Sequence, residues 1–190
     1  NAMKHYFNTW KIAHPYWEDF KNSIIQYTKV DLNWFFDQWF ETSKTIDYAV
    51  GRIKRNKKEK DSYFIKIKRK GEMQMPIDFT VEAKDGQKYS FYIPNNWFEK
   101  ETDAQKLPRW IGWGKLQPVY NAKVNIPSGI DKIQIDTTFR LADRNMLNNS
   151  NKMPVKTFFD AQIHNPPNWK NYDAFIRPDL WYNAYDGVKL

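Results

Sequence analysis

The apolar positions near the start of the chain recur with the period of an α-helix. From Trp17 they fall three and four residues apart, at Trp17, Phe20, Ile24 and Tyr27. This spacing predicts an amphipathic helix that begins after the break at His14-Pro15.

A second helix is predicted directly after Asp31, which is a good N-cap residue. A helix pair this short cannot bury many large side chains against itself. We therefore expect the aromatic stripe of the second helix to pack on the rest of the chain or on a partner. The stripe consists of Leu32, Phe35, Phe36, Trp39 and Phe40.

From Asp47 onward the period changes from about 3.6 to about 2, which predicts strands. The clearest strand is 72–82, in which Pro76 indicates a sheet edge or a bulge because proline cannot donate a ladder hydrogen bond. Asp85-Gly86 predicts a hairpin into a return strand at 89–93. Short strands joined without intervening helices favour an antiparallel, immunoglobulin-like β-sandwich, so the whole chain is predicted to be α+β. The other predicted strands are 47–53, 63–70, 119–126 and 130–135.

These patterns divide the chain into four parts. Residues 1–3, Asn-Ala-Met, are interpreted as a remnant of an expression tag, so we expect the natural sequence to extend further upstream. Residues 4–45 form the helical segment and 46–143 the sandwich. Residues 144–190 are rich in Asn and Pro and lose the periodicity, which predicts an extended arm or connector toward a further domain. We expect the aromatic residues of this arm to dock on another part of the structure.

Composition excludes several classes of protein. The 190 residues include no Cys, so disulfide scaffolds, thiolate metal sites and cysteine nucleophiles are excluded. No run approaches the roughly 18 apolar residues of a membrane-spanning helix, so we predict no such segment.

The net charge of +8 is concentrated in residues 51–115, which carry 16 basic and 9 acidic residues. Lys66, Lys68 and Lys70 alternate with apolar residues, and we interpret them as the solvent face of a strand that is guarded against edge pairing. A basic hairpin that grips phosphate is the alternative interpretation. We predict no nucleic-acid partner.

No catalytic motif is visible in the sequence. His5, His14 and His164 lack ligand partners at metal spacing, and there is no HExxH, P-loop, GxGxxG, GxSxG or EF-hand pattern. We therefore expect this chain to have no catalytic residue, no metal ligand and no cofactor.

Four aromatic residues on or near the loops between 92 and 118 offer another function. Exposed rings on a sandwich can stack on sugars, which would make the chain a carbohydrate- or protein-binding module. The competing interpretation is that these rings anchor the loops to the core. The four residues are Tyr92, Trp97, Trp110 and Trp113.

One block carries a more specific pattern. FNTWKIAHPYWEDF, a short helix and VDLNWFFDQWFETSKTIDYAV together resemble the end of the catalytic domain in the aminopeptidase N family of zinc metallopeptidases, the gluzincins. In that family a DLxWFFxxWxxxxGxPxxxY signature leads into a β-sandwich. Here Ser43-Lys44-Thr45-Ile46 replaces the Gly and Pro of the usual turn. GEMQMPIDFTVEAKDGQKYSFYIP and KIQIDTTFRLADRNMLNN are similar to the sandwich domain of bacterial members. The matching positions are Pro15, Asp19, Phe20, Asp31, Leu32, Trp34, Phe35, Phe36, Trp39 and Tyr48.

The resemblance implies that the chain belongs to a larger zinc-dependent aminopeptidase, a hydrolase of peptides. The sequence itself leaves the compartment open, and for the parent protein the cell envelope, the periplasm or secretion is favoured over the cytoplasm. The family's zinc ligands and catalytic tyrosine precede the matching block, so no catalytic or metal role falls on a residue of this chain. The resemblance implies a noncatalytic, structural piece. Its aromatic residues would be buried by the missing catalytic domain or, without that domain, would promote self-association.

Overall fold

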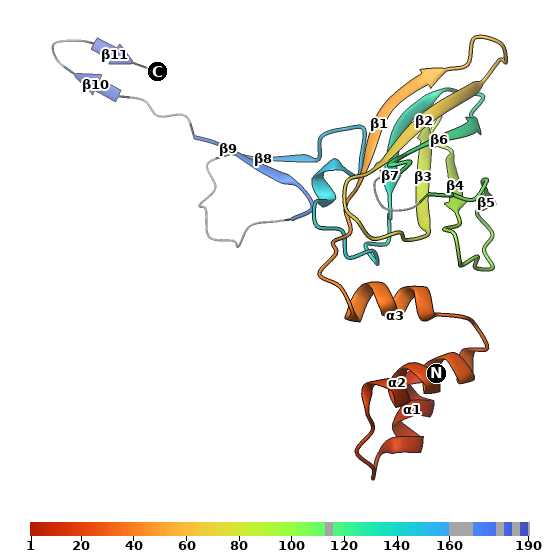
Figure 1. Cartoon of the computed structure of the whole chain (residues 1–190). Coiled ribbons are helices and arrows are strands. Elements are labelled where there is room, and N and C mark those ends of the chain that lie inside the picture. Colours follow the sequence, from red (N-terminus) through yellow and green to blue (C-terminus); the bar gives the residue numbers. More distant parts are fainter. Residues whose placement is uncertain (113–115, 160–168, 178–180, 184–186, 190) are drawn as a thin grey trace.

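The computed structural model describes residues 1–112, 116–159, 169–177, 181–183 and 187–189. Three helices open the chain: α1 (Ala2–Trp10), α2 (Trp17–Thr28) and α3 (Asn33–Phe40). They lie together on one side of a β-sheet body, with α3 nearest to it (Figure 1). None of the described helices has the length and apolar character needed to cross a membrane.

Local hydrogen bonds set where the helices begin. The Tyr16 backbone N–H donates to Asp19 Oδ2 at 2.9 Å, which caps α2 after the predicted break. The predicted N-cap of α3 is wrong by one residue, because Leu32 holds that position. Asp31 still caps the helix from one residue earlier, since its Oδ1 accepts the Asn33 backbone N–H at 3.0 Å. This hydrogen bond lowers the pKa of the Asp31 carboxyl.

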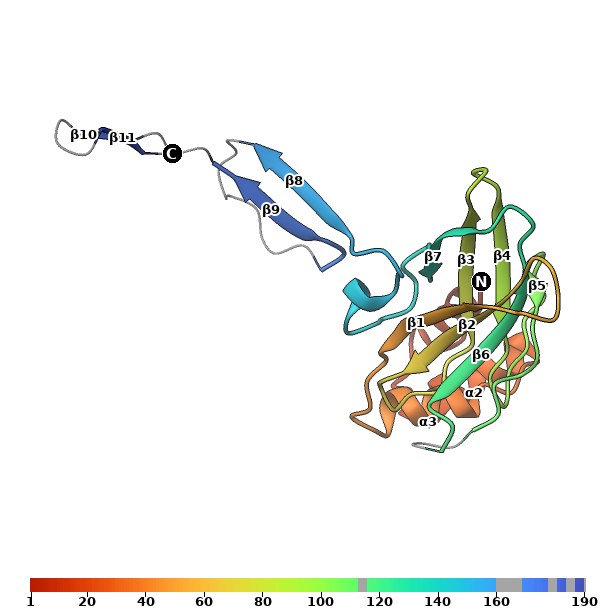
Figure 2. The same cartoon turned by 90° about the horizontal axis from the view of Figure 1, so that it is seen from above.

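Two sheets form the body (Figure 2). One has the order β1-β2-β6, built from β1 (Tyr48–Arg55), β2 (Ser62–Arg69) and β6 (Val119–Asn125). The other has the order β5-β4-β3-β7. Its strands are β3 (Ile77–Ala83), β4 (Lys88–Ile93), β5 (Gln105–Lys106) and β7 (Ile130–Ile135). All pairs are antiparallel except β4 with β5. The chain is therefore a mixed α+β protein.

The inward residues of both sheets share one hydrophobic core. Ile65 and Ile67 of β2 are fully buried together with Val81 of β3 and Ile133 of β7, as the alternation of apolar and polar residues predicts. Tyr48 lies in the same core. Its hydroxyl donates to Met73 O at 3.0 Å and accepts the Met75 N–H at 2.9 Å. Burial raises the pKa of Tyr48 to about 12, so the phenol stays neutral.

Two sequence predictions about the strands are wrong. The strand predicted over 72–82 begins only at Ile77, so Pro76 precedes it, and β3 lies between β4 and β7 rather than at an edge. Residues 71–76 instead cross from one sheet to the other. The edge-guarding interpretation of Lys66 and Lys68 also fails, because β2 is the central strand of its sheet.

The tail after β7 first runs along the body, where Asp143 Oδ2 accepts the Tyr48 N–H at 3.0 Å and Asn151 Oδ1 accepts the Ile133 N–H at 2.6 Å, and only its later part leaves the body. It contains a short 3₁₀ turn (Met146–Asn148), a parallel pair of β8 (Val155–Phe159) with β9 (Tyr172–Ile176), and an antiparallel pair of β10 (Trp181–Asn183) with β11 (Gly187–Lys189). Both views show β8 to β11 projecting away from the sheets (Figures 1 and 2). The expectation that the tail aromatics dock is wrong for Phe159 and Trp169, which are exposed.

Candidate functional site

A continuous chain of ring contacts links the helices to the sheet body, and we call it the aromatic spine. In α1 and α2 it runs from Tyr6 to Phe20, whose ring centroids are 5.0 Å apart, and on to Trp17. Phe36 of α3 contacts Trp17 at 5.5 Å. The spine consists of Tyr6, Trp17, Phe20, Trp34, Phe35, Phe36, Trp39, Phe40, Trp97 and Phe98.

Trp34 makes the spine's contact with the sheet body. It is 8% exposed, and its ring stacks on Trp97 at 6.1 Å with an interplanar angle of 6°. Phe98 packs beside it at 5.9 Å. The indole Nε1 of Trp34 has no hydrogen-bond acceptor among the described residues, so the ring holds its place by packing alone.

A chain of side-chain amides reinforces this contact. Gln38 is buried, its Nε2 donates to Trp34 O at 3.0 Å, and its Oε1 accepts the Gln74 backbone N–H at 2.8 Å. Gln74 O in turn accepts Nδ2 of Asn95 at 3.1 Å. Asn95 Oδ1 then accepts the backbone N–H groups of Trp97 and Phe98, which fixes the loop against which Trp34 packs. No pattern in the sequence predicts this role for Gln38 or Asn95.

Several large apolar side chains of the helical segment remain exposed, two of which also belong to the spine, and we call this set the helical apolar surface. Phe40 is 58% exposed although its ring lies 4.1 Å from that of Trp17. Single exposed apolar residues are ordinary, whereas seven large ones within the first forty residues leave much apolar area of the helical segment open to water. The surface comprises Met3, Phe7, Ile12, Tyr16, Tyr27, Trp39 and Phe40.

The structure brings part of the predicted signature together. Phe20, Trp34, Phe35, Phe36 and Trp39 all belong to the aromatic spine. The remaining signature positions have local roles or lie elsewhere. Pro15 lies in the segment before α2, Asp19 and Asp31 cap helices, Leu32 precedes α3, and Tyr48 belongs to the core between the sheets.

The proposed sugar-stacking residues do not form an exposed platform. Tyr92 and Trp110 are buried, and Trp110 packs on Tyr48 at 5.8 Å. Trp97 is partly exposed, but one face of its ring is stacked on Trp34. Trp113 lies outside the described residues.

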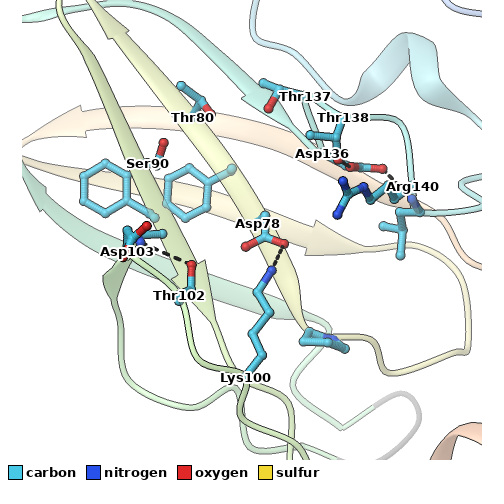
Figure 3. Close-up of a pocket in the computed structure, with 15 residues that line it drawn as sticks. Asp78, Thr80, Ser90, Lys100, Thr102, Asp103, Asp136, Thr137, Thr138 and Arg140 are labelled. Atoms are coloured by element: carbon cyan, nitrogen blue, oxygen red, sulfur yellow. Dashed lines mark hydrogen bonds and ion pairs between the residues drawn. The ribbon is translucent and has the colours of Figure 1, made fainter. Parts of the chain in front are cut away.

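A polar hollow lies on the outer face of the four-stranded sheet, and we call it the sheet groove (Figure 3). It encloses about 530 Å³. Asp78, Thr80 and Ser90 form its floor, and Lys100 reaches in from the loop before β5 to pair with Asp78 at 2.6 Å. The wall opposite this loop is the segment 136–141 after β7. A second hollow of about 440 Å³ shares Thr80 and Ser90 and extends the groove toward Phe139.

The 136–141 segment holds two residues in an unfavourable backbone conformation. Asp136 has φ of 46° and Phe139 has φ of 54°, a region that costs non-glycine residues about 1 to 2 kcal/mol each. Asp136 stabilises the segment, because its carboxylate accepts hydrogen bonds from Thr138 Oγ1 at 3.0 Å and from the Leu141 N–H at 2.5 Å. The segment thereby exposes Phe139 and Arg140.

The outer face of the other sheet carries much of the positive charge. Arg52, Lys54, Lys66 and Lys68 line a hollow of about 420 Å³ together with Phe64 and Asn121. None of these four cations forms an ion pair with a described residue. The absence of a nucleic-acid partner stays a prediction.

The described residues include no group of three or more His, Asp or Glu side chains placed to hold a metal ion. His5 instead stacks on Tyr27 at 4.9 Å, and His164 lies outside the described residues. No protein-family model matches the chain, and no curated protein or solved structure shows a significant match to it.

Proposed function

We propose that this chain is a noncatalytic packing module whose helices dock on a further protein domain through the helical apolar surface. The observation that carries this proposal is the difference in burial among the large aromatic side chains of α3. Trp34 is buried against the sheet body, whereas Trp39 and Phe40 on the same helix remain exposed. Both rings also pack within the spine, but a large part of each remains in contact with water, and a partner domain would cover that part.

The connection between helices and sheets also fits a packing role. Lys21 of α2 pairs with Asp37 of α3 at 2.8 Å, and Gln38 of α3 binds the segment that joins the two sheets. The helices, the spine and the sheet body are therefore linked, so a partner on the helical surface would be positioned relative to the sheets. Covering the helical apolar surface removes apolar area from water, which is the main driving force for association.

We further propose that the module belongs to an aminopeptidase N-like zinc metallopeptidase and that its body is an immunoglobulin-like sandwich. The support for the family is the residue pattern from Pro15 to Tyr48, half of which gathers in the spine. The support for the sandwich is strand order. The first, second and fifth long strands, β1, β2 and β6, form one sheet in this order, and the fourth, third and sixth, β4, β3 and β7, form the other. Ser150 pairs with Gln134 of β7 at the edge of the second sheet, where a seventh strand would lie. In the absence of its partner domain, the same surface would favour self-association.

Elemental analysis and a peptidase assay test the noncatalytic role. The purified 190-residue chain is expected to hold far less than one zinc ion per molecule and to show no hydrolysis of leucine p-nitroanilide, because it contains no HExxH and no described metal cluster. A known zinc aminopeptidase serves as the positive control. Stoichiometric zinc or turnover by this chain would contradict the proposal.

The coding sequence upstream of Lys4 tests the family separately. An HExxH pattern encoded in the same reading frame supports the aminopeptidase assignment. A natural start codon at Met3 would overturn that assignment and leave the packing role to be tested alone.

A further inference from the structure

The sheet groove combines backbone strain with several polar side chains that have no partner among the described residues. Asp136 and Phe139 both have positive φ, and bulky residues such as Phe adopt this conformation only where the surroundings enforce it. Such strain concentrates at binding sites, because it holds side chains in the conformation that a ligand requires. Here the strained segment leaves Phe139 44% exposed to solvent and places Arg140 in the lining of the groove. Neither the helices nor the aromatic spine contributes to this site.

The side chains that line the groove include both donors and acceptors of hydrogen bonds. Threonine and serine hydroxyls both donate and accept, and they are joined by charged groups without a partner. Arg140 and Asp103 form no ion pair with described residues, and they come from opposite walls of the groove (Figure 3). The hydroxyl groups belong to Thr80, Ser90 and Thr137, together with Thr102, which also accepts the Ala104 N–H, and Thr138, which also donates to Asp136.

The charges of the residues that line the groove and its extension cancel. Four carboxylates and four cations line the two hollows, and Lys170 over the Phe139 ring adds one positive charge, so the site has little net charge with which to select an ion. The carboxylates are Asp78, Glu82, Asp103 and Asp136, and the cations are Lys88, Lys100, Lys132 and Arg140. The combined character fits a neutral ligand rich in hydroxyl groups.

The geometry points to a neutral oligosaccharide as the ligand of the sheet groove, with Phe139 as the ring on which one sugar stacks. Lys170 Nζ lies 4.1 Å from the centroid of Phe139, so a sugar would meet the opposite face of that ring. Asp78, Asp103 and Arg140 would bind the sugar hydroxyl groups. The hollow of about 530 Å³ lies within the usual size range of ligand sites.

An extended peptide fits this site less well. Peptides that bind sheets pair with the main chain of an exposed edge strand. The groove instead lies over β3, whose main chain is already paired with β4 on one side and β7 on the other. The main chain of β3 is therefore not available to a ligand, which favours a sugar polymer over an added peptide strand.

A glycan array followed by calorimetry tests the inference. The chain is expected to bind at least one neutral glycan on the array, and the best of cellohexaose, xylohexaose and maltohexaose is expected to bind with a dissociation constant below about 1 mM. The informative variant is Phe139→Asn, because asparagine tolerates positive φ and removes the ring without adding strain. Its affinity is expected to fall at least tenfold while its melting temperature stays level or rises. Arg140→Ala is expected to weaken binding several-fold.

Phe64→Ala is the matched control, since it removes a ring of similar exposure, 37%, from the outer face of the other sheet. Its affinity for the same oligosaccharide should not change. The inference is overturned if no neutral glycan binds, if only charged glycans bind, if an unstructured peptide binds instead, or if Phe139→Asn binds as tightly as the unaltered chain.

Discussion

Replacement of Gly71 by alanine is expected to lower the free energy of unfolding by about 3 kcal/mol or more. Gly71 lies where the chain crosses between the sheets, and its backbone runs directly against residues 45–47. A Cβ atom at this position would lie 2.3 Å from Thr45 O and 2.7 Å from Asp47 N. Both atoms belong to the main chain, so the clash can be relieved only by moving backbone.

That movement would break hydrogen bonds that hold the crossing in place. The N–H groups of Lys70 and Gly71 donate to Asp47 O at 2.7 and 3.0 Å, and that of Glu72 donates to Thr45 O at 3.0 Å. Urea denaturation followed by circular dichroism measures the loss.

Gly86→Ala provides the control for Gly71→Ala. A Cβ at Gly86 would meet nothing within 4 Å, but the residue has φ of 85°, so the only cost is backbone strain of about 1 kcal/mol. A loss at Gly71 no larger than that at Gly86 would show that the crossing is not packed as described.

The Trp34→Ala substitution is expected to release the helices from the sheet body at a cost of about 3 kcal/mol. The ring is nearly buried and joins α3 to Trp97 and Phe98, so its removal leaves a cavity at the junction. Hydrogen exchange measured by mass spectrometry should show faster exchange throughout α1 to α3. The strands β2 and β3 should keep their protection, because their core lies between the sheets.

Trp39→Ala is the matched control on the same helix. Trp39 is 37% exposed and contacts Phe35 at 5.7 Å, so its loss is expected to cost less than about 1 kcal/mol. Equal effects of the two substitutions on helix exchange would contradict the role assigned to Trp34.

The body of the fold follows closely from local sequence signals. The alternation around Ile65 and Ile67 places both side chains in the core, and Asp85-Gly86 forms the hairpin between β3 and β4. Which strand is central depends on pairing between distant segments, and periodicity does not report it. This is why β2 and β3 were expected near edges.

The aromatic spine could be predicted only in part. The helical spacing of Phe35, Phe36 and Trp39 indicates a stripe that needs a partner. It does not indicate that Trp34, outside the stripe, makes the main contact with the sheet body. That contact depends on the Trp97 loop, whose shape is set by Asn95: its Oδ1 accepts the Phe98 N–H within the loop, and its Nδ2 donates to Gln74 O, 21 residues away.

The sheet groove had almost no signal in the sequence. Asp136 and Phe139 adopt positive φ, but neither is glycine, so the turn carries no obvious marker beyond the tolerance of aspartate for this conformation. Phe139 was not among the ring-stacking residues expected from the sequence. Those expectations followed tryptophan and tyrosine content, which reports large apolar side chains and not their exposure.

Hydroxyl-radical footprinting of the helices tests the central claim most directly. The oxidation rates of Phe7, Tyr16 and Phe40 would be compared between the 190-residue chain and the full product of its reading frame, which the proposal expects to be extended upstream of Lys4, with Phe64 as the internal reference. All four side chains are exposed in the structure. A docked partner domain predicts that oxidation of Phe7, Tyr16 and Phe40 falls several-fold in the extended chain while that of Phe64 is unchanged. Equal oxidation of the helical residues in both chains would contradict the docking role.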